Sequence, residues 1–211
     1  MQVLMIILAL AGAYLLGSIP SAVWIGKRIF KTDVRNYGSG NAGATNTMRV
    51  LGPKAALPVF IMDLLKAFAA AQLVRLFPEF SPGTAAFINF QLGLGAMAVV
   101  GHIFPLYAQF KGGKGVASLL GVVFALHPLI ALIGLGIFML ILMISHYVSL
   151  GSMIAGISFP IMVVFIFKIT VPSLIVFSVL VSVLLLITHQ KNIERLLRKE
   201  ESKIYLFRKD K

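Results

Sequence analysis

The chain has 211 residues, of which 59% are apolar and 12% are charged. A charged share about half that of a soluble domain cannot cover a soluble core, so the composition excludes a soluble protein and indicates one that spans a membrane. The net charge is +12, but the basic residues flank apolar stretches, which is a topology pattern of membrane proteins and not evidence for nucleic-acid binding.

The first apolar segment, residues 2–25, has no basic region before it and no A-x-A cleavage site, so we expect a retained span rather than a cleaved signal. The elements expected next are a polar glycine-rich loop at 26–53, a second span at 54–77, a turn at 78–83, a third span at 84–109, and a short basic loop at 110–115.

Residues 116–187 are almost continuously apolar. Plausible breaks at residues 127–128, 146–149 and 168–172 give four more spans, at 116–126, 129–145, 150–167 and 171–188. The first of these is short for a full crossing, since a span needs about 20 residues. The sequence therefore predicts an all-α, polytopic membrane bundle of seven transmembrane helices, with six as the alternative.

The basic residues help to decide the count. Sixteen of the 19 lie in or beside the first loop, in the loop at 110–115, or in the tail at 190–211, and all should face the cytoplasm. Seven spans satisfy this, with the N-terminus outside and the C-terminus in the cytoplasm, whereas six do not. We expect one transmembrane domain over 1–211, ending in a basic cytoplasmic tail at 190–211 that lies against anionic lipid.

The first loop contains a glycine-rich motif over residues 37–46, followed by Arg49. Closely spaced glycines let backbone N–H groups turn toward one point, and an arginine fork suits phosphate oxygens, so we favour an anion site over a flexible linker. Ala44 stands where a Walker A loop requires lysine, so nothing supports ATP hydrolysis. The candidate ligand residues are Gly38, Ser39, Gly40, Asn41, Gly43, Thr45, Asn46 and Arg49.

A second motif runs from Gly101-His102 to the turn F-K-G-G-K-G at 110–115. Two lysines and three glycines in five residues make a compact cationic turn, and lysine binds phosphate as a point charge. A positive-inside loop is the alternative, but glycines on both sides of Lys114 favour close approach to a ligand. The candidates here are His102, Lys111, Gly112, Gly113 and Lys114.

A third motif ends the last span, where His189, Asn192 and Arg195 would share one helical face. His189 and Glu194 also fit the H-x-x-x-x-acid spacing of acyltransferases that use acyl-coenzyme A, but five residues apart on a helix they would face different directions.

Other polar residues lie in or beside the apolar segments. Asp63 and Lys66 carry charges inside the second span, where each is costly, so we expect the two to pair. Ser149 and Ser152 are either packing residues or ligand donors. No cysteine is present and the four histidines form no ligand-like cluster, so we expect neither a metal nor another cofactor.

Together these motifs resemble the bacterial membrane acyltransferases that move a fatty acyl group from acyl phosphate to glycerol 3-phosphate. The resemblance covers L-G-S-I-P at 16–20, Asp33 and Arg35, the glycine loop with Arg49, Asp63 and Lys66, G-H-I-F-P, F-K-G-G-K-G-V-A, and His189, Asn192 and Arg195. Ser118 replaces a usual threonine but keeps the hydroxyl, and Lys199 replaces a usual glycine before the matching Glu201.

The resemblance implies a seven-span enzyme of the bacterial cytoplasmic (inner) membrane, with its active site on the cytoplasmic face. Because an acyl phosphate is already activated, we expect direct attack on it without an acyl-enzyme. The base is either His189 or a substrate phosphate, and we favour the phosphate, with His189 orienting it. The expected partners include membrane lipid but no nucleic acid and no obligatory protein. The expected catalytic residues are Ser39, Arg49, Lys114, His189 and Asn192, with Ser149, Ser152, Arg195 and the other candidates above binding substrate. The rival class is a transporter or channel for a phosphorylated solute, which would need polar residues across the midplane.

Overall fold

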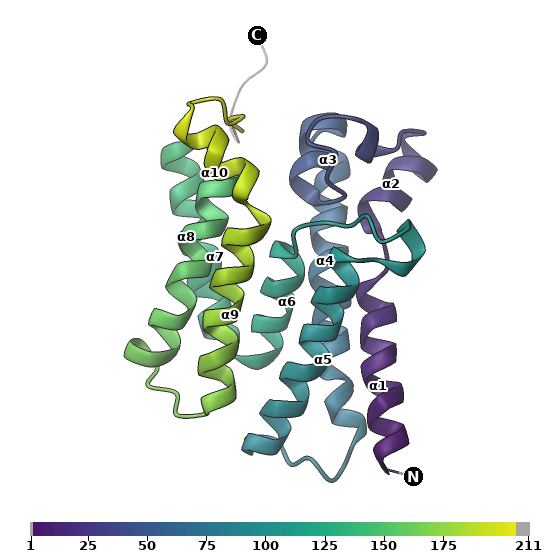
Figure 1. Ribbon diagram of the computed structural model, residues 1–211, viewed down its shortest axis with the longest axis vertical. Helices are drawn as coiled ribbons and strands as arrows, with labels where there is room; N and C mark the ends of the chain where they lie inside the picture. The colour runs from purple at the N-terminus through teal and green to yellow at the C-terminus, as the bar shows by residue number, and fades with distance from the viewer. Residues whose placement is uncertain (1, 206–211) are drawn as a thin grey trace. The chain divides into compact units, whose positions relative to one another are not determined.

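The computed structural model describes residues 2–205, and all regular secondary structure within this range is helical. The α-helices, labelled in Figure 1, are α1 (Gln2–Gly17), α2 (Ser21–Ile29), α3 (Ala44–Leu51), α4 (Pro53–Gln72), α5 (Ala85–Ile103), α6 (Val116–Leu126), α7 (Pro128–Ser145), α8 (Val148–Ile161), α9 (Pro172–Thr188) and α10 (Gln190–Leu197). The 3-10 turns are η1 (Val34–Asn36), η2 (Leu73–Leu76) and η3 (Leu106–Ala108), and η4 (Met162–Ile166) is a π turn. Three basic residues of the predicted tail, Arg208, Lys209 and Lys211, lie outside the described range.

The chain divides into two compact units, one ending at His127 and the other beginning at Pro128. Among the described residues, four helical segments are long and apolar enough to cross a membrane: Pro53–Leu76, Ala85–Ala108, Pro128–Ser145 and Val148–Ile166. Two bent pairs, α1 with α2 and α9 with α10, raise the count to six if each pair is one span. The predicted all-helical, multi-spanning fold is confirmed, and α6, with 11 residues, is the segment that separates a count of six from seven.

The first predicted span is broken in the structure. α1 and α2 meet at an angle of 42°, and the break falls at residues 18–20, which include Pro20. Glycines bring α1 and α5 into backbone contact, because a Cβ on Gly17 would collide with the backbone of Ala98 and one on Gly101 with the carbonyl of Tyr14. Small residues at crossings are how membrane helices approach closely, so this crossing fixes the break in place.

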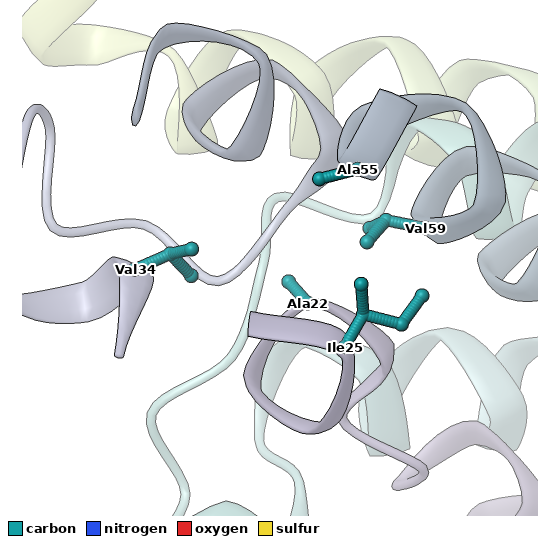
Figure 2. Close-up of a cluster of buried hydrophobic side chains, with 5 residues drawn as sticks. All are labelled: Ala22, Ile25, Val34, Ala55 and Val59. Carbon is teal, nitrogen blue, oxygen red and sulfur yellow. The ribbon is translucent and has the colours of Figure 1, made fainter. Parts of the chain in front are cut away.

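A small hydrophobic cluster ties the segment after the break to α4. Figure 2 shows Ala22 and Ile25 of α2, Val34 of η1, and Ala55 and Val59 of α4 gathered together, and all five are buried. Partly buried Phe30, Ala44 and Leu51 pack against them. Since Val34 lies just before the glycine-rich stretch at 37–43 and Ala44 follows it at the start of α3, the cluster anchors both ends of that stretch.

The second unit consists of α7 to α10 and the segment that follows. Gly156 brings α8 close to α9, since a Cβ there would have to displace the end of the Leu185 side chain. The Ser182 hydroxyl donates to the Gly156 carbonyl at 2.7 Å. After α10 the chain folds back, and the Ile204 N–H donates to the His146 carbonyl at 2.8 Å. The predicted tail helix is present, but it meets α9 at a bend of 60°.

Candidate active site

The two glycine-rich loops of the first unit lie against each other. The Ala42 N–H donates to the Gly112 carbonyl at 3.3 Å, joining the loop at 37–43 to the turn at 110–115. Nearby, the Arg35 guanidinium donates to the Ala108 carbonyl at 3.1 Å. Segments some 70 residues apart, each predicted separately to bind phosphate, are therefore neighbours.

The side chain of Asn46 holds the glycine loop in shape. Its oxygen accepts from the Ser39 N–H at 2.8 Å and from the Ser39 hydroxyl at 3.1 Å. Its nitrogen donates to the carbonyls of Val34 and Tyr37, at 2.7 and 3.1 Å. Because these four bonds fill the capacity of a carboxamide, the structure gives Asn46 the role of organising the loop, where the sequence predicted a phosphate ligand.

Helix α3 begins directly after the glycine loop, with Gly43 in the cap position. Thr45 and Arg49 are four residues apart and so lie on one face of α3, and both are partly buried. The exposed part of the loop contains Gly38, Ser39 and Gly40, and both of these glycines have positive φ, at 61° and 71°.

The turn at 110–115 packs on the end of α5. The Gly113 N–H donates to the His102 carbonyl at 3.1 Å, a Cβ on Gly112 would collide with that carbonyl, and one on Gly113 would collide with the imidazole. The glycines are thus required for close approach to His102, whereas the sequence predicted close approach to a ligand. The histidine, predicted to bind substrate, is 95% buried beneath the turn, while Lys111 is exposed and Lys114 partly buried.

The predicted pairing of Asp63 with Lys66 is confirmed, with Lys66 Nζ 2.7 Å from Asp63 Oδ1. The sequence did not predict the other groups that meet this pair. The Ser21 hydroxyl donates to the same oxygen at 2.9 Å, and His102 Nδ1 lies 3.4 Å from it. The Ser118 hydroxyl donates to the Asp63 backbone carbonyl at 3.2 Å. Serine and the usual threonine both supply the hydroxyl that this bond needs.

A second ionic cluster lies at the start of the polar loop. Arg35 binds both oxygens of Asp33, at 3.0 and 2.8 Å, and Lys27 lies 3.2 Å from the same carboxylate. The Arg35 guanidinium holds the pKa of Asp33 well below its usual range, despite the opposing effect of burial. Sequence reasoning noted these residues only within the resemblance. The D-x-R spacing is the available signal, because an arginine two residues on can reach back to the acid.

In the second unit, three predicted site residues converge on a carboxylate that was not predicted as a site residue. Glu201 accepts from the Ser149 hydroxyl at 3.1 Å, from the Asn192 amide at 2.8 Å and from Arg195 Nε at 2.7 Å. Burial opposes ionisation of Glu201, but the bonds from Arg195, Asn192 and Ser149 outweigh it and lower the pKa. Ser152 instead bonds within its helix, donating to the Val148 carbonyl at 2.8 Å.

His189 lies at the bend between α9 and α10 and is buried. Its Nδ1 is 2.8 Å from the Leu185 carbonyl, and since a carbonyl only accepts, Nδ1 carries the proton of that bond. The neutral ring therefore has its acceptor at Nε2. Glu194 differs in its surroundings, because it is exposed and pairs with Arg198 at 2.8 Å.

Comparisons with known proteins match almost the whole length of the chain, and they all point to one family. Residues 7–199 match the family described as glycerol-3-phosphate acyltransferase. The chain is 42% identical over 202 residues to the glycerol-3-phosphate acyltransferase of Staphylococcus carnosus, covering 95% of this chain and 98% of the relative. It is 38% identical over 226 residues to that of Chlorobium phaeobacteroides, covering 94% and 96%.

Two crystal structures of PlsY (YgiH), an integral membrane glycerol 3-phosphate acyltransferase, are also similar to this chain. The glycerol 3-phosphate form has a TM-score of 0.84 at 36% identity, covering 95% of this chain and 96% of that one. The lysophosphatidic acid form has a TM-score of 0.80 at 35% identity, with the same coverage.

Proposed function

Since the chain belongs to the glycerol-3-phosphate acyltransferase family, we propose that it takes a fatty acyl group from an acyl phosphate and transfers it to glycerol 3-phosphate. The products are 1-acylglycerol 3-phosphate (lysophosphatidic acid) and inorganic phosphate. PlsY structures carrying glycerol 3-phosphate and lysophosphatidic acid support the acceptor and the product. The family membership leaves no support for the alternative of a transporter or channel.

The observation that carries the choice of donor is the contact between the glycine loop and the 110–115 turn. The acceptor and an acyl phosphate each contain a phosphate group, and the two groups repel each other. Neighbouring loops that combine backbone N–H groups with Arg49 and Lys114 suit such a pair of anions. The same cations would stabilise the charge on the departing phosphate, which is the principal electrostatic demand of the reaction.

The chemistry needs no covalent intermediate on the protein. The glycerol 3-phosphate hydroxyl oxygen forms a bond to the acyl carbon, the bond from that carbon to the phosphate oxygen breaks, and the hydroxyl proton passes to a phosphate oxygen. A role for His189 in orienting phosphate requires the imidazolium, because the neutral ring has only an acceptor at Nε2. His189, Asn192, Arg195, Ser149 and Ser152 belong to the second unit, and their part in substrate binding stays a prediction.

The proposed setting is the bacterial cytoplasmic membrane, with the chain forming a single enzymatic domain and its basic segments facing the cytoplasm. Counting α6 as a short crossing supports seven spans with the N-terminus outside. The polar loop, the 110–115 turn and the tail would then share the cytoplasmic face, where glycerol 3-phosphate is available. Membrane lipid surrounds the spans, and the acyl chain of the donor would lie among them.

A donor comparison tests the proposal. Purified enzyme with saturating glycerol 3-phosphate is given palmitoyl phosphate or palmitoyl-CoA, and lysophosphatidic acid is measured. We expect turnover with palmitoyl phosphate alone, because coenzyme A needs an apolar shelf, and Tyr37 and Phe110 are the only aromatic residues well inside the two glycine-rich loops. The exposed position of Glu194, with His189 buried, also argues against a coenzyme A motif.

Phosphate release with glycerol 3-phosphate omitted is the control for hydrolysis of the donor. Equal turnover from palmitoyl-CoA would show that the donor assignment is wrong, and the helical argument against Glu194 would be withdrawn with it.

A further inference from the structure

The carboxylate of Asp63 stands near the middle of α4, where a charge is costly, and it is 99% buried. Its Oδ1 is within 2.9 Å of the Ser21 hydroxyl and 2.7 Å of Lys66 Nζ. Lys66 in turn donates to the Ile19 carbonyl at 2.6 Å. The pair therefore binds a backbone carbonyl inside the break between α1 and α2 and the first residue of α2, and so fixes the start of α2.

The start of α2 leads directly to the glycine loop. Ala22, next to Ser21, packs in the hydrophobic cluster with Val34 (Figure 2). The Val34 carbonyl accepts from Asn46, whose oxygen holds Ser39. A displacement of Ser21 would therefore shift Ala22 and Val34, and through Asn46 it would move the loop that contains Ser39.

A second route runs from Asp63 to the 110–115 turn. His102 lies with Nδ1 3.4 Å from Asp63 Oδ1, and its ring occupies the space next to Gly113. Its carbonyl accepts from the Gly113 N–H at 3.1 Å, and Lys114 follows directly. On the far side of the turn, Ser118 of α6 donates to the backbone carbonyl of Asp63 at 3.2 Å. Residues on both flanks of Lys114 are therefore packed against the same residue of α4, on one side through His102 and on the other through Ser118.

Stability alone is a weak reason to keep such a pair, because the desolvation of buried ions commonly offsets their attraction. Fixing a unique arrangement is a better one, and here the two routes end at loops that are themselves in contact, through Ala42 and Gly112.

We propose that Asp63, Lys66 and His102 are positioning residues that hold the glycine loop and the 110–115 turn in register, so that both present their phosphate-binding groups together. His102 then acts from beneath the turn and not by touching substrate. The kinetic part of this inference rests on the proposed function, but the register of the loops can be measured without any substrate.

The test compares Asp63→Asn and His102→Gln with a matched control, Gln91→Leu. Gln91 is also buried in α5 and bonds to α6, through the Ala125 carbonyl at 3.1 Å, but it lies about three helical turns from His102. Because the chain has no cysteine, spin labels can be placed at Tyr37→Cys and Lys111→Cys, and the distance distribution between the loops is measured by electron resonance. KM and kcat are measured on unlabelled, monodisperse protein with palmitoyl phosphate as donor.

We expect Asp63→Asn and His102→Gln to broaden the interloop distance distribution and to raise the KM for glycerol 3-phosphate at least tenfold. Gln91→Leu should lower the melting temperature while leaving both readouts unchanged. The proposal is overturned if the two variants match Gln91→Leu in distance and in KM. If Asp63→Asn yields no folded protein, His102→Gln, which leaves the ion pair intact, decides alone. If the wild-type enzyme is inactive with palmitoyl phosphate, the donor assignment is wrong. The interloop distances would still test the positioning role of Asp63, Lys66 and His102.

Discussion

Arg49 and Lys114 differ from Lys66 in where they lie. Lys66 is buried inside a span, whereas Arg49 and Lys114 are partly buried beside glycine-rich backbone. We therefore expect Arg49→Ala and Lys114→Ala to affect catalysis more than folding. Losing a charge-assisted contact worth about 1.5–3 kcal/mol should lower kcat/KM roughly tenfold to 150-fold, with little change in melting temperature.

Lys31→Ala is the control for the loss of one positive charge, because Lys31 is exposed and donates to a backbone carbonyl of its own segment, that of Arg28. It should retain nearly normal activity. A well-folded Lys114→Ala protein with near-normal kcat/KM would remove that lysine from the site.

For single residues, the sequence identified which residues belong to the phosphate loops, but not whether each side chain binds a ligand or another part of the protein. The glycines, Asn46 and His102 were all recognised as parts of phosphate loops. A sequence cannot show whether an amide serves a ligand or its own loop, because both uses require the same donors. The filled bonding capacity of Asn46 became visible only with the carbonyls of Val34 and Tyr37 in place.

At the scale of elements, the segment after α10 is closed onto α8 and α10 by Glu201, which is only 6% exposed. The pKa of Glu201 is lowered on folding, so its bonds stabilise the fold above the usual pKa of 4.5 and this contribution is lost as the pH falls toward the folded value. We expect the melting temperature of the wild type to fall more steeply than that of Glu201→Gln as the pH is lowered from 5 to 3, the range in which this contribution is lost.

Glu194→Gln provides the comparison, because Glu194 is exposed in a pair with Arg198. Its melting curve should follow the wild type across the same pH range. Parallel pH profiles for wild type and Glu201→Gln would contradict the role assigned to the buried carboxylate.

The helices themselves were largely predictable, because long apolar runs bounded by polar loops leave few alternatives in a membrane. The three breaks after residue 116 were also predicted, but the break inside the first span was not. The first span was expected to run unbroken over residues 2–25, and Pro20 was the signal for its interruption. Where a span breaks is decided by contacts with other helices, such as Gly17 against Ala98, and these are invisible in a local pattern.

For the whole molecule, the open question is topology, since the spans number four to six by length and apolar character among residues 2–205. Because clustered Lys and Arg stay on the cytoplasmic side, we expect the two termini on opposite faces. The chain has no cysteine, so a single cysteine ahead of Gln2 or after Lys211 can be labelled selectively with an impermeant reagent. The first should react from outside and the second from the cytoplasmic side.

A cysteine at Tyr37, which is exposed in the glycine loop, serves as the marker for the cytoplasmic face. It should be labelled from the same side as the C-terminal cysteine. Labelling of both termini from one face would reject seven spans and make α6 a segment that enters the membrane without crossing it.

The charges in α4 also bear on how the chain enters the membrane as it is made. Asp63 and Lys66 lie near the centre of this helix, and each opposes its release into lipid by about 2.5–3.5 kcal/mol. Their partners outside α4 at the α1–α2 break, Ser21 and the Ile19 carbonyl, belong to the segment synthesised before it. The free energy of moving α4 into lipid is therefore lowest when the earlier segment is already beside it and its polar groups bind the two charges. We therefore expect α4 of the first unit to enter the membrane together with α1 and α2, which are synthesised before it.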